Sequence, residues 1–334
     1  MQDRLSNIFE KLVKEKVMVI FAYAGQGSQY VSMGTDMYES FPEYKQVLDK
    51  FDNYSHIKEL MKDGPAEELT QTENTQPAFA LFAAGVTEVL RANGINPDGA
   101  CGLSLGEYGA LYAADVLSME DYVNTVAYRG KVMQEAAKGL SCAMSAILGL
   151  EADKVTEVVK AAYSEIEAKG GYVTVANYNC PGQYVICGDE EAVSFTEEKL
   201  KEAGAKRCIR LNVSGPFHTK YMQPAADKLK ARLDEIDIKE AKIPVTLNST
   251  GNFLDKDSDL RALLEKQIRS SVHFEEDVIK FLDKGADVFI EIGPGKVLTG
   301  FIKKIAAANS KEVKIYTVDK AEDLNKVISE LSNN

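Results

Sequence analysis

The pentapeptide Gly102-Leu103-Ser104-Leu105-Gly106 constrains this chain most strongly, because it stands between a short strand pattern near 98–103 and a helical pattern near 106–114. It fits G-x-S-x-G, in which glycines permit a sharp strand-to-helix turn and the turn pushes the serine hydroxyl into a cleft. The amide of Leu105, near the start of the helix, then points toward a developing oxyanion. A glycine-flanked serine is often only a helix N-cap, but the strand before it and the helix after it favour a nucleophile.

Strand and helix patterns alternate along most of the chain, and this alternation predicts a mostly parallel sheet in an α/β fold. The first strand is the continuous apolar run Val17–Tyr23, which is typical of a buried strand. Pro77 stands just before one of the predicted helices. The other patterns predict helices at 36–50, 78–93, 119–138 and from about 320, and strands at 244–248, 286–291 and 312–317.

The middle of the chain changes character and predicts a separate small subdomain over 139–213. Its order is β-α-β-β-α-β, the split ferredoxin-like unit. We expect it to be inserted into a large domain formed by 17–138 and 214–334, and residues 1–16 to form an amphipathic helical extension. The predicted elements are strands at 143–148, 172–178, 184–187 and 206–211, and helices at 151–168 and 190–203.

Composition excludes several classes of protein. A net charge of −12 speaks against nucleic acid as the main partner, since phosphate binding needs a basic surface. No apolar run approaches the roughly 20 residues of a membrane helix, so no membrane association is expected. The five cysteines show no CxxC spacing, so neither a metal site nor a disulfide framework is indicated, and a cytoplasmic location fits.

A serine nucleophile needs a base, and the chain offers three histidines. His218 follows Gly215-Pro216-Phe217, a turn after a strand that can aim a side chain into a cleft, and is the best candidate. His56 lies in a polar segment typical of a surface helix. His273 begins a helix, and its role stays open.

Gly25-Gln26-Gly27-Ser28-Gln29 follows the first strand and lets the backbone approach a reacting centre. The amide of Gln26 is a candidate second donor to an oxyanion. A glycine-rich phosphate-binding turn is the alternative, but neither the Walker pattern nor the dinucleotide fingerprint is present.

Seven motifs in order make the chain resemble the malonyl-CoA:acyl carrier protein transacylases of bacterial fatty acid synthesis. The resemblance covers nearly everything after residue 17 and implies an α/β-hydrolase-like large domain. The motifs are GQGSQ at 25–29, TQPA at 75–78, GLSLGEY at 102–108, YRGKVMQEA at 128–136, NYNCPGQYVICG at 177–188, GPFH at 215–218 and EIGPGKVLTG at 291–300.

The resemblance implies a role for each matching residue. Ser104 is expected to carry the acyl group and His218 to act as its base, while the amides of Gln26 and Leu105 bind the oxyanion. Arg129 is expected to bind the free malonyl carboxylate, which suits a planar guanidinium that stays charged when buried. The remaining expected pocket residues are Gln76, which shapes the same pocket, and Asn177 and Asn179, which line the carrier channel.

Three positions bear on specificity and on departures from the family. Leu103 stands where the family often has histidine, which makes that wall of the pocket apolar. His273 aligns with a position where the family commonly has glutamine or arginine and where a backbone carbonyl orients the catalytic histidine. Phe217 is bulky and is expected to crowd the α-carbon pocket and to favour malonyl over branched methylmalonyl groups.

The implied reaction is a ping-pong transfer from malonyl-CoA to an acyl carrier protein, with no cofactor and no metal. Two rival hypotheses remain, a serine hydrolase and a non-catalytic carrier-binding module. Within the transacylase hypothesis, a free-standing acyltransferase of a polyketide pathway carries the same motifs.

Overall fold

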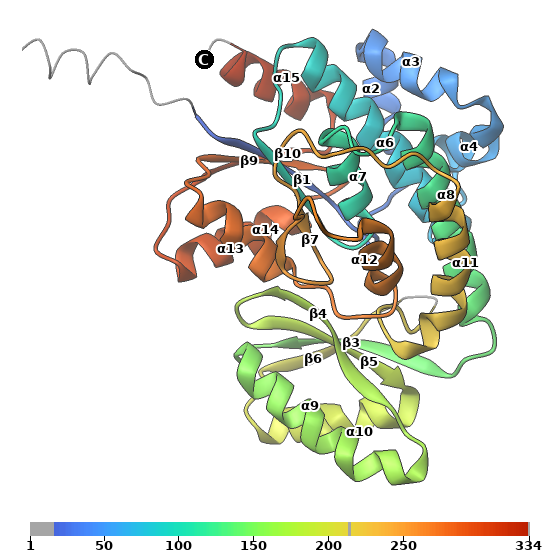
Figure 1. Ribbon diagram of the computed structural model, residues 1–334, viewed down its shortest axis with the longest axis vertical. Coiled ribbons are helices and arrows are strands. Elements are labelled where there is room, and N and C mark those ends of the chain that lie inside the picture. Colours follow the sequence, from blue (N-terminus) through green and yellow to red (C-terminus); the bar gives the residue numbers. More distant parts are fainter. Residues whose placement is uncertain (1–16, 213–214, 333–334) are drawn as a thin grey trace, which may run out of the picture.

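Two separate sheets organise the molecule, one in each subdomain of the computed structural model (Figure 1). The structure describes residues 17–212 and 215–332. The helix predicted over 1–16 lies outside the described residues.

The large sheet has the strand order β10-β9-β1-β2, and every neighbouring pair is parallel. Its strands are β1 (Val19–Tyr23), β2 (Gly99–Gly102), β9 (Val288–Ile292) and β10 (Lys314–Val318). β2 and β9 are buried along their whole length and β1 along nearly all of it, as expected for apolar strands covered on both faces. Since Tyr23 pairs with Gly102, the chain leaves β1 and β2 at the same edge of the sheet.

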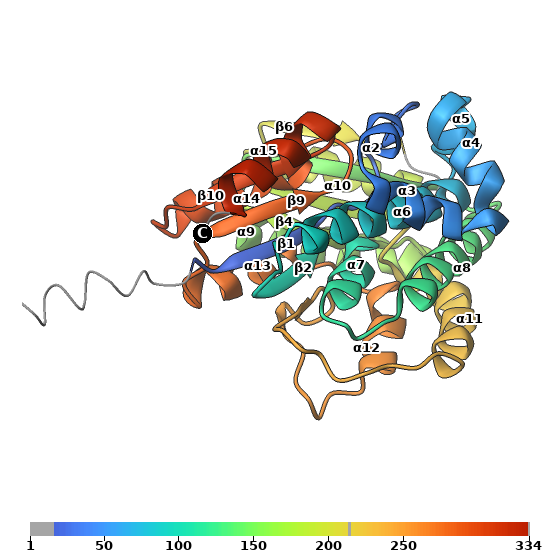
Figure 2. The same cartoon turned by 90° about the horizontal axis from the view of Figure 1, so that it is seen from above.

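Helices cover both faces of this sheet, with α6 and α15 above and α13 and α14 below β1, β9 and β10 in the view of Figure 1. The view from above shows α7, α8 and α11 following one another along the side beyond β2 (Figure 2). A short hairpin of β7 (Thr246–Leu247) and β8 (Asn252–Phe253) lies next to β2, where Val245 bridges Ala100. The helices of the large domain are α2 (Thr35–Ser40), α3 (Pro42–Lys50), η1 (Asp52–Tyr54), α4 (Ser55–Asp63), α5 (Ala66–Leu69), α6 (Thr72–Ala92), α7 (Gly106–Ala113), α8 (Met119–Ala137), η3 (Lys220–Met222), α11 (Gln223–Asp234), α12 (Leu260–Gln267), α13 (Phe274–Asp283), α14 (Val297–Ala308) and α15 (Ala321–Leu331).

Helix α6 begins at Thr72, whereas the sequence prediction placed its start just after Pro77. Proline inside a helix removes one backbone hydrogen bond, so the prediction treated Pro77 as a boundary. The turn before it is nevertheless buried, including Thr72, Thr75 and Gln76. Tertiary packing of this segment therefore outweighs the local cost of the proline.

The small subdomain is an antiparallel sheet with the order β4-β5-β3-β6, covered on its outer face by α9 and α10 (Figure 1). The predicted α/β class, with a mostly parallel sheet and a separate ferredoxin-like unit, is confirmed. The elements are β3 (Cys142–Leu148), α9 (Ala152–Ile166), η2 (Glu167–Lys169), β4 (Val173–Cys180), β5 (Gln183–Asp189), α10 (Glu190–Glu202) and β6 (Arg207–Arg210).

The small sheet is attached to the large domain through the edge of β4. The amide of Val272 donates to the carbonyl of Ala176 at 2.9 Å, and the amide of Tyr178 donates to the carbonyl of Val272 at 2.8 Å. The ring of His273 stacks on Tyr178 with centroids 5.0 Å apart. These contacts hold the inner face of the small sheet over the edge where β1 and β2 end.

Among the helices of residues 17–212 and 215–332, none combines the length and apolar character required to cross a bilayer.

Glycine is required where α7 meets the end of β1. A Cβ added to Gly106 would overlap the carbonyl of Tyr23, and one added to Gly102 would overlap the backbone of Gly106. The two glycines therefore let the strand-to-helix turn close against the neighbouring strand.

We predict that Gly106→Ala lowers the free energy of unfolding by roughly 1–3 kcal/mol, because the added methyl group forces two backbone segments apart. Gly300→Ala is the matched control, since Gly300 is an exposed residue of α14 with nothing near its Cβ position. The control should gain up to about 1 kcal/mol from helix propensity. Urea denaturation followed by circular dichroism measures both, and an unchanged midpoint for Gly106→Ala contradicts the prediction.

Candidate active site

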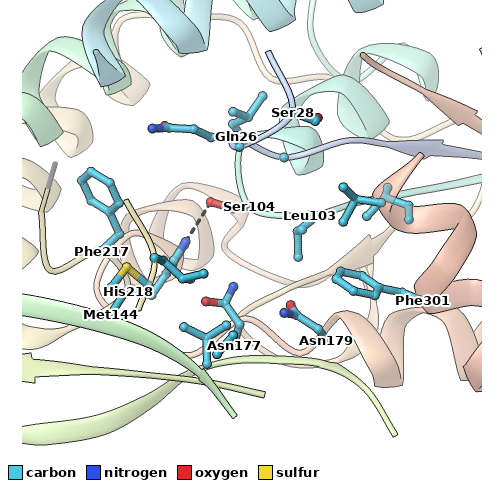
Figure 3. Close-up of a pocket in the computed structure, with 18 of the residues that line it drawn as sticks. Gln26, Ser28, Leu103, Ser104, Met144, Asn177, Asn179, Phe217, His218 and Phe301 are labelled. Carbon is cyan, nitrogen blue, oxygen red and sulfur yellow. Dashed lines mark hydrogen bonds between the residues drawn. The ribbon is translucent and has the colours of Figure 1, made fainter. Parts of the chain in front are cut away.

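A cavity of about 410 Å³ lies between the two subdomains, at the edge where β1 and β2 end. Figure 3 shows Gln26 and Ser28 on one side of it and Asn177 and Asn179 on the other, with Ser104 between them. The large domain therefore forms one side of the cavity, and the small subdomain forms the facing side. Most of its remaining wall is apolar, with Leu103, Met144, Phe217, Val297 and Phe301 among the lining residues.

Ser104 stands on the turn between β2 and α7 with φ of 55°, in the left-handed region that non-glycine residues rarely adopt. Its Oγ lies 2.8 Å from Nε2 of His218. The strained turn and the close imidazole together form the geometry of an activated serine nucleophile.

His218 also has a left-handed backbone, with φ of 60°. Its Nδ1 lies 3.0 Å from the carbonyl oxygen of Gln267. A carbonyl can only accept, so Nδ1 carries the proton and Nε2 is left to accept from the Ser104 hydroxyl. A carbonyl thus takes the orienting place that an aspartate holds in a catalytic triad.

The expected source of this carbonyl was wrong. The sequence alignment placed it at His273, whereas the structure places it at Gln267, at the end of α12. His273 is not among the cavity-lining residues. Its ring packs on Tyr178 and its Nδ1 lies 3.3 Å from Glu276, so its side chain belongs to the contact between the subdomains.

The pKa of His218 is lowered to about 4, first by burial and then by the positive charge of Arg129. Both causes disfavour the imidazolium, and the Gln267 carbonyl opposes them only in part. The imidazole is therefore neutral and able to accept a proton at neutral pH.

Arg129 lies on α8 with no exposed surface. Its Nη1 donates to Gln76 Oε1 at 2.8 Å, and its Nη2 donates to Gln267 Oε1 and to Ser104 Oγ, both at 3.1 Å. In the described ranges no carboxylate forms an ion pair with it, and its Nε has no partner. A buried cation held only by neutral acceptors, next to a nucleophile, is suited to receive an anionic group.

Gln26 and Leu105 both line the cavity, and their backbone amides are the candidate oxyanion donors. Leu105 precedes the first residue of α7, and Gln26 follows β1. Within the part of the chain that the structure describes, neither amide has a recorded acceptor. The side chain of Gln26 is turned away and donates to Thr72 Oγ1 at 3.2 Å, which anchors the loop.

The other predicted pocket residues are distributed around the cavity. Leu103 and Phe217 line its large-domain side, and Gln76 lines the end near Arg129, where its Nε2 contacts Met133 Sδ at 3.3 Å. Asn177 and Asn179 come from β4 and line the opposite wall.

Sequence reasoning missed Gln267, Asn248 and Glu107. The side chains of Gln267 and Asn248 are hydrogen-bonded to the backbone of Ser104, and Glu107 is hydrogen-bonded to Asn248. Asn248 ends the strand predicted at 244–248, and a polar residue at that end of a parallel strand is a usable signal. Gln267 gave no signal, because a polar residue on an amphipathic helix normally indicates a solvent-facing position. Glu107 stands on α7, which is buried on every side, so a carboxyl group in that apolar segment was a usable signal.

Three comparisons place the chain among known proteins. Residues 20–322 match the family model of the acyl transferase domain. The malonyl CoA-acyl carrier protein transacylase of Bacillus subtilis (strain 168) is 45% identical over 289 residues, which cover 86% of this chain and 90% of that protein. The crystal structure of the malonyl CoA-acyl carrier protein transacylase from Clostridium perfringens superposes with a TM-score of 0.87 at 38% identity, covering 95% of this chain and 98% of that one. A malonyl-transacylase solved in complex with its type II PKS acyl-carrier protein superposes with a TM-score of 0.86 at 33% identity, covering 94% of this chain and 99% of that one.

We predict that Ser104 reacts with phenylmethanesulfonyl fluoride at a rate that is constant from about pH 8 to pH 5 and halves near pH 4. The lowered pKa of His218 keeps the base unprotonated throughout this range, and its protonation below about pH 4 removes the acceptor for the serine proton. The reagent has no ionisable group, so the profile reports the enzyme alone.

His218→Ala should abolish this reaction, and circular dichroism at each pH verifies that the protein is folded. A midpoint near the ordinary histidine value of about 6.5 contradicts the prediction.

Proposed function

Because this chain belongs to the acyl transferase family and, within it, to the malonyl-CoA:acyl carrier protein transacylases, we propose that it moves a malonyl group from coenzyme A to the thiol of an acyl carrier protein. The observation that carries the proposal is the buried guanidinium of Arg129, 3.1 Å from Ser104 Oγ and without a carboxylate partner in the described ranges. A serine hydrolase acting on neutral esters has no need of this buried cation.

In the first half-reaction, Nε2 of His218 takes the proton of Ser104 while Oγ attacks the thioester carbonyl. The amides of Gln26 and Leu105 donate to the oxyanion of the tetrahedral intermediate. The carbon–sulfur bond then breaks, the proton returns to the sulfur of coenzyme A, and a malonyl ester remains on Ser104.

The second half-reaction reverses these roles with a different thiol. His218 takes the proton of the carrier's pantetheine thiol, whose sulfur attacks the ester carbonyl. The carbon–oxygen bond breaks, and Ser104 regains its proton. Coenzyme A enters only as part of the substrate, and the proposed steps use no cofactor.

Arg129 supplies selectivity for an acyl group that ends in a carboxylate. Its Nη atoms, now held by the side-chain oxygens of Gln76 and Gln267, match the two oxygens of a carboxylate in a bidentate pair. Both glutamines keep the guanidinium plane fixed before substrate arrives, which lowers the cost of binding.

Fatty acid synthesis is the pathway that we propose, because the relatives of this chain include the Bacillus subtilis transacylase and its solved counterparts. A polyketide pathway is the alternative, favoured by the likeness to the transacylase solved with a type II PKS carrier. Comparing kcat/KM for the fatty-acid and polyketide carriers of the same organism separates the two. We also propose a cytoplasmic location, which cell fractionation tests; recovery of the chain outside the cytoplasm contradicts it.

Intact-protein mass after brief exposure to malonyl-CoA tests the function directly. The parent chain should gain one malonyl group and Ser104→Ala none. Arg129→Ala should load malonyl about 100- to 10,000-fold more slowly, since it loses two charged hydrogen bonds of about 1.5–3 kcal/mol each, and should gain relative preference for acetyl.

Arg91→Ala is the control, because Arg91 is a partly buried arginine that pairs with Glu88 outside the cavity. An unmodified parent chain with free malonate released would instead favour the hydrolase. An unmodified chain with malonyl-CoA intact would favour the binding module.

Phe217→Ala should raise loading of methylmalonyl relative to malonyl by about 10-fold or more, because the smaller side chain admits one extra methyl group beside His218. Phe301→Ala is the matched control, since Phe301 lines the opposite side of the cavity (Figure 3). The ratio of the two kcat/KM values is the measurement. Equal loading of both substrates by the parent chain would contradict a role for Phe217.

A further inference from the structure

Asn248 lies directly behind the nucleophile, fully buried at the end of β7. Its Oδ1 accepts from the amide of Ser104 at 2.7 Å, and its Nδ2 donates to the carbonyl of Gly102 at 2.7 Å. The side chain of Asn248 therefore holds the backbone at the end of β2 and at Ser104. It comes from a segment 144 residues further along the chain.

Two buried carboxyl groups hold Asn248 in turn. Its side-chain Nδ2 also donates to Asp277 Oδ2 at 2.7 Å, and its backbone N–H donates to Glu107 Oε2 at 2.7 Å. Glu107 comes from α7 and Asp277 from α13, so three elements meet at this one asparagine.

This arrangement is costly for the fold. Glu107 and Asp277 have no exposed surface, and none of the ion pairs among the described residues includes either of them. Within residues 17–212 and 215–332, Oε1 of Glu107 and Oδ1 of Asp277 have no hydrogen-bond partner. Burial raises the pKa of Glu107 to about 7. Burial, together with the nearby charge of Glu107, also raises the pKa of Asp277 well above its usual range. Well-packed apolar residues would stabilise such a site more, so the polar cluster indicates a requirement other than stability.

The requirement is found in the backbone of Ser104. Its left-handed conformation costs roughly 1–2 kcal/mol for a residue with a Cβ and persists only if its surroundings fix it. Asn248 binds its N–H, and Gln267 Nε2 donates to its carbonyl oxygen at 2.7 Å. With the Ser104 amide directed inward, the next amide, that of Leu105, is left to face the cavity.

We infer that Asn248, held by Glu107 and Asp277, is a positioning residue for the acyl transfer. It fixes the Ser104 backbone so that Oγ meets His218 and the Leu105 amide meets the oxyanion. This inference rests on the proposed function. The hydrogen bonds of Arg129 in the described residues do not include Asn248, and Asn248 is not among the residues that line the cavity, so we expect it to act on the rate of acylation and not on substrate binding.

The test is the single-turnover rate of Ser104 acylation at varied malonyl-CoA, divided by the fraction of chains that can be acylated. Asn248→Ala should lower the saturating rate per acylable chain by about 10- to 100-fold, the effect of a misplacement of up to 1 Å. The half-saturating malonyl-CoA concentration should stay within about twofold. Ser249→Ala is the matched control, since this buried neighbour contacts Leu263 and not the turn.

Asp277 provides the conservative rescue. Asp277→Asn retains an acceptor for Asn248 Nδ2 and should keep the rate within about threefold of the parent, whereas Asp277→Leu should reduce it as Asn248→Ala does. If Asn248→Ala only lowers the acylable fraction while each remaining chain reacts at the parent rate, the residue is merely structural and the inference is overturned. If Asp277→Asn and Asp277→Leu change the acylation rate equally, the role of Asp277 in holding Asn248 is overturned.

A second measurement separates this inference from the proposed function. Inactivation by phenylmethanesulfonyl fluoride requires the same serine, base and oxyanion donors but no malonyl group. If the parent chain takes up no malonyl, the proposed function fails, and the sulfonylation rate of Asn248→Ala still decides the inference. Slower sulfonylation supports it, and a parent-like rate overturns it.

Discussion

The close approach of α7 to the end of β1 is the constraint on which the site depends. Gly106 lies against the carbonyl of Tyr23, and the amide of Leu103 donates to that same carbonyl at 3.0 Å. Parallel pairing of β1 with β2 brings the two chain segments to one edge, and the glycine lets them touch. Ser104 and the Gln26 loop are therefore neighbours because of strand register and a missing methyl group.

A single buried cation links recognition to chemistry. Arg129 contacts Ser104 Oγ and also disfavours the charged form of His218. The charge that is proposed to bind an anionic acyl group thus adds to burial in keeping the base unprotonated. Its neutral acceptors, Gln76 and Gln267, do not cancel this effect as a carboxylate would.

The sequence was sufficient for the alternation of strands and helices around the nucleophile, the β-α-β-β-α-β unit and the pairing of Ser104 with His218, because each is encoded by local periodicity or a short motif. It set no bounds for the helices α4, α5 and α11 to α14, and it merged α2 and α3 into one helix. The start of α6 was wrong, since local proline chemistry cannot report how completely a turn will be buried. The acceptor for His218 was placed at His273 instead of Gln267 because the irregular segment between α12 and α13 has no periodicity to fix an alignment. Asn248 and Glu107 act through contacts between distant segments, and no window of sequence contains those contacts.

Every described side chain bonded to Ser104 belongs to the large domain, whereas Asn177 and Asn179 belong to the inserted subdomain. The reacting groups thus lie in the large domain, and the wall of the cavity that faces them lies in the small subdomain. Substitutions in the small subdomain can reshape one wall of the cavity without changing the residues that are bonded to Ser104. Proteins with this division can differ in the wall that the small subdomain contributes while they keep the same reaction.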